Sequence, residues 1–132
     1  MSRLAVVLAV FPAAAAAQDI PALSQVERIT EGLFATAIAY EIGRVCPDLD
    51  GRRIEGVAFL LSLQAHARSL GFSQEEIDAY IDNDEEFDRL EAIARERLAG
   101  MGAVEGEPGT YCALGRAEIA KGSQIGRLLR ES

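Results

Sequence analysis

Apolar residues recur every three or four positions along most of the chain, which is the period of an amphipathic helix. The first such segment predicts a helix over residues 25–45, with one face formed by Val26, Ile29, Leu33, Ala37 and Tyr40. Ser24 and Glu27 stand at the spacing of a capping box, which favours a helix start next to Ser24. Pro47 is expected to end this helix at Cys46, because the residue before a proline is disfavoured in helical geometry.

A second helix is predicted over residues 51–70, after the turn chemistry of residues 48–51. Its middle, residues 57–63, is apolar on nearly every side. A helix with that profile is usually surrounded by other elements. We therefore expect this helix to be central and buried, and we expect Gly71 to end it as a left-handed cap.

Two further helices follow. Ser73 and Glu76 have capping-box spacing, which predicts that the third helix starts at residue 74. Residues 82–84 are aspartate, asparagine and aspartate, which form helices poorly but cap them well. The pattern predicts a break or kink there and a fourth helix over residues 85–99.

The last third of the chain begins with a loop, since residues 100–109 contain four glycines and a proline. A fifth helix is predicted over residues 110–121, and Gly122 with Ser123 can end it and cap a final short helix through Leu129. The glycines of this region are also spaced to let another backbone approach closely: Gly115, Gly122 and Gly126. No stretch alternates in the manner of a strand, so we expect no β-structure.

These elements predict an all-α fold, a compact bundle of about five helices. The chain has 132 residues, which is enough for one small domain and too few for two. Its 49% hydrophobic and 26% charged residues are typical of globular proteins. We therefore expect a single helical domain over residues 18–132.

Residues 1–17 have the pattern of a cleaved signal peptide. A basic start at Arg3 leads into an apolar run and an alanine-rich end, where Ala15 and Ala17 supply the small residues that a signal peptidase accepts. We expect cleavage between Ala17 and Gln18. A membrane anchor, the alternative, needs about 20 apolar residues. The apolar segment is shorter and contains a proline, so we expect a periplasmic or secreted product without an anchor.

Cys46 and Cys112 are the two cysteines of the chain. An exported protein meets oxidising conditions, so we expect a disulfide between them. Closing a loop of this length contributes roughly 4 kcal/mol in the chain-entropy account. The pair forms no C-x-x-C motif, which leaves thioredoxin-like redox chemistry, haem attachment and a cysteine zinc site without support. No metal and no cofactor are expected.

Catalytic signatures are scarce, and the sequence assigns no catalytic residue. His66 is the single histidine and has mostly apolar helical neighbours, which favours a partly buried structural role. Zinc hydrolases need several converging ligands, and serine hydrolases need a strained turn such as G-x-S-x-G, which the chain lacks. Asp82, Asp84 and Glu86 alternate as in an EF-hand loop, but Phe87 stands where that loop needs glycine. Specific calcium binding is therefore not expected.

The formal net charge of −8 disfavours nucleic acid and anionic membranes as partners. Residues 75–91 hold nine carboxylates against one base, Arg89. We expect eight of these carboxylates to form a candidate interaction face for a basic protein or small ligand. We call them the acidic face: Glu75, Glu76, Asp78, Asp82, Asp84, Glu85, Glu86 and Asp88. The alternatives are a solvated helix surface and a carboxylate pair acting as acid and base in a hydrolase. Mutual repulsion is expected to raise the average carboxylate pKa in this face.

Several segments together resemble a known family: Gly71-Phe72-Ser73, Tyr80-Ile81, the Gly100 loop, and residues 110–119 followed by 125–129. On these residues the chain is similar to a group of small exported alphaproteobacterial proteins classed as a domain of unknown function. The resemblance spans most of the mature chain, implies a periplasmic helical domain, and carries over no functional residue. A looser similarity, to small disulfide-bonded acid-stress chaperones of the periplasm, rests on size, compartment and cysteine count alone.

The sequence thus predicts a non-catalytic periplasmic domain that binds another protein or a small ligand through its helical surface, with the acidic face as the candidate contact. The alternatives are a carboxylate-based hydrolase and an acid-stress chaperone-like protein. A deep pocket with converging carboxylates would favour the hydrolase, whereas a convex acidic surface would favour binding.

Overall fold

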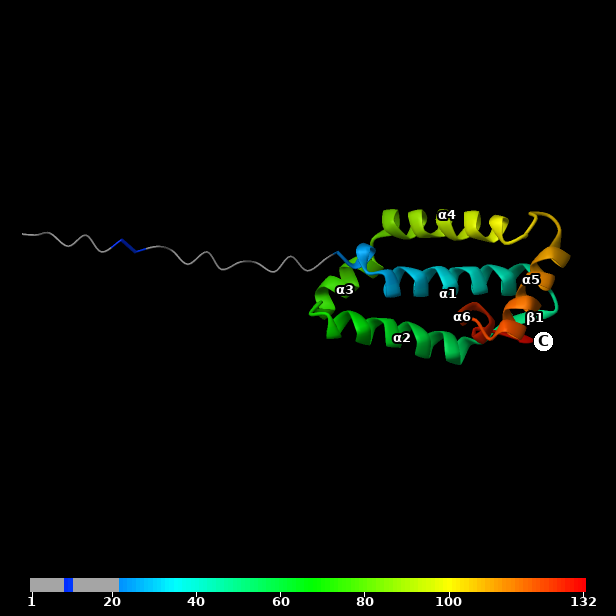
Figure 1. Cartoon of the computed structure of the whole chain (residues 1–132), viewed down its shortest axis with the longest axis horizontal. Helices are drawn as coiled ribbons and strands as arrows, with labels where there is room; N and C mark the ends of the chain where they lie inside the picture. Colours follow the sequence, from blue (N-terminus) through cyan, green and yellow to red (C-terminus); the bar gives the residue numbers. More distant parts are fainter. Residues whose placement is uncertain (1–8, 11–21) are drawn as a thin grey trace, which may run out of the picture.

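The computed structural model describes residues 9–10 and 22–132 (Figure 1). Within them the chain forms six α-helices, one 3-10 helix and one two-stranded sheet. In chain order the elements are η1 (Leu23–Gln25), α1 (Glu27–Val45), β1 (Leu49–Gly51), α2 (Arg53–Ser69), α3 (Gln74–Ile81), α4 (Asp84–Gly100), α5 (Pro108–Lys121), α6 (Gln124–Arg127) and β2 (Leu129–Glu131). The predicted all-α fold is confirmed. The predicted leader lies outside the described residues except at residues 9–10.

Most predicted helix boundaries are confirmed, because the signals behind them are local. The Ser73 hydroxyl accepts a hydrogen bond from the Glu76 N–H at 3.1 Å, and the Glu76 carboxylate accepts one from the Ser73 N–H, which completes the capping box of α3. The predicted break is real: α3 ends at Ile81, and the Asn83 side chain caps α4 by accepting from the Glu86 N–H at 3.1 Å. Gly71 has a positive φ of 98°, as expected for a left-handed cap.

The predicted start of the first helix is wrong. Ser24 lies in η1, and α1 begins at Glu27, after Val26 in an extended conformation. The Ser24 side chain makes no capping hydrogen bond for α1. Leu23 is buried, and its packing against Ile29 and the start of α3 fixes the entry of the chain in place of the capping box.

The central helix is α1, not the predicted second helix. Figure 1 shows α1 between α4 and α2, and α1 contacts α2, α4, α5, α6 and the sheet. Its buried residues point in several directions around the axis: Ile29, Gly32, Phe34, Ile38, Ala39 and Ile42. In contrast, α2 buries Leu63 and Ala67 and leaves Val57 and Leu61 exposed. The prediction that α2 is central failed. A helix can be apolar on all sides even when the rest of its own chain packs against only one of them.

The expectation of no β-structure is also wrong. Strands β1 and β2 pair antiparallel, with Leu49 opposite Glu131 and Gly51 opposite Leu129. Each strand has three residues, which is too short for an alternating pattern to stand out in the sequence. Leu49 and Leu129 are both buried, so the pairing joins the C-terminus to the main core.

The predicted Cys46–Cys112 disulfide is formed, with the two Cα atoms 5.1 Å apart. Cys46 is the residue that ends α1, and Cys112 lies near the start of α5. Both cysteines belong to the larger hydrophobic cluster, with Ile42 and Leu49 beside them. The bridge therefore fixes the carboxyl end of the central helix to the C-terminal third of the chain.

Two glycines of that third allow close packing, as predicted. A Cβ on Gly126 would lie 2.1 Å from the Glu118 carbonyl oxygen, because α6 folds back against α5. A Cβ on Gly115 would lie within 3 Å of the Ile42 and Leu49 side chains. Gly122 has open space around it, and its φ of 63° gives it the role of a left-handed cap instead. Among the described residues, no helix is both long and apolar enough to cross a membrane.

Candidate functional site

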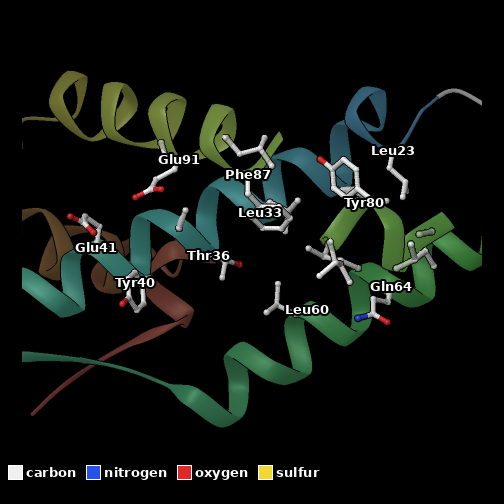
Figure 2. Close-up of a pocket in the computed structure, with 18 of the residues that line it drawn as sticks. Leu23, Leu33, Thr36, Tyr40, Glu41, Leu60, Gln64, Tyr80, Phe87 and Glu91 are labelled. Carbon is white, nitrogen blue, oxygen red and sulfur yellow. The ribbon is translucent and has the colours of Figure 1, made fainter. Parts of the chain in front are cut away.

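An apolar groove of about 630 Å³ runs between α2 and α4, with α1 as its floor (Figure 2). α3 links the two walls and closes one end, where Ile77 and Tyr80 meet Leu23. Four helices therefore contribute to one site: Leu33, Thr36, Ala37 and Tyr40 from α1, Leu60, Leu63, Gln64 and Ala67 from α2, Ile77, Tyr80 and Ile81 from α3, and Phe87, Leu90, Ala94 and Leu98 from α4. Most of these side chains carry no polar atom.

The amphipathic pattern of the helices places these side chains. In α4 the buried residues Leu90, Ala94 and Leu98 recur every four positions and turn one face toward α1. In α2 the corresponding face carries Leu63 and Ala67. Leu63 of α2 also packs against Gly32 of α1, where the lack of a side chain lets the two helices approach closely. Because α2 and α4 both pack on α1, the space between them remains open as the groove.

The carboxylates that line the groove lie toward one end, whereas Gln64 and Tyr80 lie toward the other. Figure 2 shows Glu41 and Glu91 at the first of these ends. Each carboxylate is paired within its own helix: Arg44 donates to Glu41, and Arg95 donates to Glu91 at 2.5 Å. The hydrogen bond from Arg44 holds the pKa of Glu41 below its usual range, against the opposing effect of its partial burial. Two positive and two negative charges thus balance at this end.

Tyr80 connects the closed end of the groove to the acidic face. Its hydroxyl donates to the Glu86 carboxylate at 3.2 Å, and Arg89 donates to the same carboxylate at 2.7 and 3.0 Å. Burial, reinforced by the Glu86 charge, raises the pKa of Tyr80 to about 12. The hydrogen bond from Arg89 lowers the pKa of Glu86, with Tyr80 adding to that effect. At Glu86 the shift is opposite in direction to the predicted average for the acidic face.

The acidic face lies outside the groove. Seven of its eight carboxylates are exposed, and Glu86 is half-buried. None of the eight lines the groove; Glu91, one turn further along α4, does. Glu76 belongs to the capping box of α3. Docking of a basic partner on this face stays a prediction, and the carboxylates do not converge in a cleft.

His66 is half-buried on α2, as the sequence predicts. Arg28 of α1 donates to its Nδ1 at 3.3 Å. A guanidinium beside the imidazole disfavours a metal cation at that nitrogen. The contact instead links the N-terminal part of α1 to the C-terminal part of α2.

One cluster of potential metal ligands occurs among the described residues, formed by Cys46, Asp48 and Cys112. Both sulfur atoms are joined in the disulfide. A metal would need them as thiolates, so the oxidised protein offers only Asp48 there. Asp48 is itself within 3.5 Å of the Arg116 guanidinium.

One buried acidic residue was not singled out from the sequence. Glu118 of α5 is 6% exposed, and its carboxylate accepts hydrogen bonds from the Ser123 hydroxyl and from Lys121 Nζ at 3.3 Å. Ser123 also caps α6 by accepting from the Gly126 N–H at 3.1 Å. These hydrogen bonds hold the corner between α5 and α6, and they engage the Glu118 carboxylate within the fold.

The groove residues were also missed as a site. Each helix showed an apolar face in the sequence, but the pattern does not give the angle between faces or the width left between them. One signal was available in the sequence: the helices carry more apolar residues than the chain itself buries. Leu60 and Phe87, which line the groove, are exposed for this reason.

Comparison with known proteins gives one match. Residues 21–130 match a protein family described as "Family of unknown function (DUF5333)". The match covers most of the chain, including both cysteines and all the groove residues. No curated protein and no solved structure matches the chain.

Proposed function

Since the chain belongs to DUF5333, a family of unknown function, we propose its role from the groove: it is an exported, non-catalytic domain that binds an elongated, largely apolar ligand between α2 and α4. The observation that carries the proposal is the groove itself. Its volume of about 630 Å³ falls within the usual range of small-molecule sites, roughly 300–1,000 Å³. Apolar walls with a few polar groups are the common composition of such sites.

The ligand class follows from where the charged groups of the groove lie. A hydrocarbon chain fits the apolar length of the groove between Leu60 and Leu90 and toward Tyr80. A polar head group fits the end that carries Glu41 and Glu91 (Figure 2). Because Arg44 and Arg95 neutralise these carboxylates, the favoured head is zwitterionic or uncharged. The proposed ligand is therefore a single-chain amphiphile.

A hydrolase gains no support from this geometry. Carboxylate hydrolases keep one carboxylic acid protonated beside a second, ionised carboxylate. The hydrogen bond from Arg44 lowers the pKa of Glu41, so this carboxyl group is not suited to donate a proton, and Glu91 is ion-paired with Arg95. The eight residues of the acidic face do not line the groove.

Export is part of the proposal. The leader pattern of residues 1–17, the disulfide and the absence of a membrane-spanning helix among the described residues support it. The test is the intact mass of the product released by the source cell or by a bacterial expression host. A chain that begins at Gln18 supports export, and a chain that retains Met1 contradicts it.

Binding is tested by calorimetry. Residues 18–132 are titrated with lysophosphatidylcholines of increasing acyl length, each kept below the concentration at which the lipid forms micelles. We expect one saturable site, tighter with each added pair of methylenes. Leu60→Glu places a charge in the groove wall and should weaken binding at least about tenfold. Leu61→Glu is the matched control, because Leu61 is exposed next to Leu60 but does not line the groove. Equal losses in both variants, or no dependence on chain length, would contradict the proposal.

A further inference from the structure

The side chain of Tyr80 lies at the end of the groove where α3 meets α4. Figure 2 shows it at the end away from Glu41 and Glu91. Its hydroxyl donates to the Glu86 carboxylate of α4 at 3.2 Å, and its ring centre lies 6.3 Å from that of Phe87, also on α4. The side chain thus starts on α3 and ends on α4, so the ring lies between the two helices.

The contacts of Tyr80 hold its ring in this position. Arg89 donates to both oxygens of the Glu86 carboxylate, at 2.7 and 3.0 Å, and such a bidentate pair fixes the orientation of the acceptor. The Glu86 side chain is 15% exposed, so water has little access to it. Burial raises the pKa of Tyr80 to about 12, so the hydroxyl keeps its proton and remains a donor at neutral pH.

The space beyond Tyr80 is closely packed. Leu23, Phe72 and Ile77 are buried in the smaller hydrophobic cluster, and Tyr80 packs against it. Tyr80 also packs against the larger cluster that contains Leu90 and Ala94 of α4. A hydrocarbon chain that extends along the groove from the other end therefore meets the Tyr80 ring, with packed side chains behind it.

We infer that Tyr80 sets the longest hydrocarbon chain that the groove accepts, an inference that rests on the proposed function. Along the floor, about 18 Å of α1 separates Ile29, in the cluster at the closed end, from Glu41 at the head-group end. An extended chain advances about 1.2 Å per bond, so the limit should lie near about 14–16 carbon atoms. Further methylenes would have to leave the groove past the exposed Ile81 and remain in water, where they add no affinity.

Lysophosphatidylcholines with chains of up to about 18 carbon atoms test the limit. The long lipids compete with a bound dodecyl chain, so that they stay below their micelle concentrations. For the wild type, affinity should rise roughly tenfold with each pair of methylenes up to the limit and stay constant beyond it.

Tyr80→Ala should extend the limit by about one or two pairs of methylenes, because it leaves a cavity in place of the ring. Its affinity for a decyl chain, which is too short to reach this end, should equal that of the wild type. Leu60→Ala is the matched control, since it removes apolar contact from the wall of the groove away from Tyr80. It should weaken all chain lengths by a similar factor and leave the limit unchanged.

Glu86 is a positioning residue, because it acts through Tyr80. Glu86→Ala removes the acceptor of the Tyr80 hydroxyl and should also admit longer chains. Glu86→Gln keeps an acceptor oxygen and should retain the wild-type limit. Glu85→Ala removes the neighbouring exposed carboxylate and should leave the limit unchanged. Glu86→Ala retains the Tyr80 ring, so it decides the question if Tyr80→Ala does not fold.

The results separate the role of Tyr80 from the proposed function. If no chain length binds, both are overturned. If chains bind but affinity still rises at about 18 carbon atoms, or if the limit of Tyr80→Ala equals that of the wild type, the role of Tyr80 is overturned and the proposed function stands. An unchanged limit in Glu86→Ala would overturn the role of Glu86.

Discussion

Single residues decide how closely the elements of this fold approach. Gly126 is the clearest case, because α6 turns back onto α5 with no space for a side chain at that position. The buried Glu118 lies at the same corner, where it accepts hydrogen bonds from Ser123 and Lys121. The absence of a side chain at Gly126 and the hydrogen-bonded Glu118 carboxylate thus act together to hold α6 against α5.

Gly126→Ala is expected to destabilise the protein by about 1–3 kcal/mol, the usual cost of overpacking. The new Cβ would lie 2.1 Å from the Glu118 carbonyl oxygen, so the backbone of α6 has to move. Gly56→Ala is the control, since Gly56 lies within α2 with open space around it. That substitution should stabilise by roughly 0.4–1 kcal/mol. Urea unfolding gives both values, and a neutral Gly126→Ala would contradict the close approach.

Tyr80 offers a pH-dependent prediction. Its folded pKa is raised to about 12 by burial and by Glu86, whereas an unfolded tyrosine titrates near 10. The neutral phenol is therefore favoured in the folded state, and the stability it supports is complete below about pH 10 and is lost as pH rises toward 12. Subtracting the ultraviolet titration of Tyr80→Phe from that of the wild type should give a curve centred near 12. A difference curve centred near 10 would show that Tyr80 is not shielded.

At the scale of elements, the sequence predicted what depends on local chemistry. The Ser73 capping box and the break at residues 82–84 are present as predicted, because a cap needs only the residues three or four positions away. The assignment of the central helix failed, because burial depends on partners that the pattern of one helix does not reveal. α1 and α2 are both rich in apolar residues, but α1 contacts four other helices, α2, α4, α5 and α6.

Arg97 links two elements that are distant in sequence. From α4 it donates to both oxygens of Glu31 on α1 at 2.8 Å, and its guanidinium carbon lies 4.2 Å from the centre of the Phe34 ring. Arg97→Ala is expected to lower the free energy of unfolding by about 1 kcal/mol, since the pair is half-exposed and screened by solvent. Arg95→Ala, which removes a pair within α4, should cost roughly 0.3–0.5 kcal/mol.

The effect of Arg97→Ala should also depend on pH. The hydrogen bond from Arg97 lowers the pKa of Glu31 below the usual value of about 4.3. The stability from this pair is present above that value and is lost as pH falls through the lowered pKa. The denaturant midpoints of Arg97→Ala and wild type are measured at pH 7 and at pH 3. The difference between the two proteins should be smaller at pH 3. A constant difference would assign the effect to Phe34 packing alone.

At the scale of the whole molecule, the groove is the feature that sequence patterns do not supply. Its lining extends from Leu23 to Leu98, and no single segment contributes more than one wall. Helical periodicity identifies the apolar faces, but the width between α2 and α4 follows from how both pack on α1. The disulfide was predictable for a different reason: the leader pattern implies an oxidising compartment, and two cysteines allow one pairing within the chain.

Reduction of the Cys46–Cys112 bond is expected to lower the free energy of unfolding by about 2–5 kcal/mol. The bond closes a loop with a sequence separation of 66 residues, so the reduced chain gains conformational freedom mainly in the unfolded state. Urea midpoints with and without a reductant measure the effect, and a Cys46→Ala/Cys112→Ala variant should be insensitive to the reductant. Because the bond joins the end of α1 to the start of α5, hydrogen exchange should increase first at the β1–β2 pair beside it. An unchanged midpoint would mean that the reduced unfolded chain already holds these segments together.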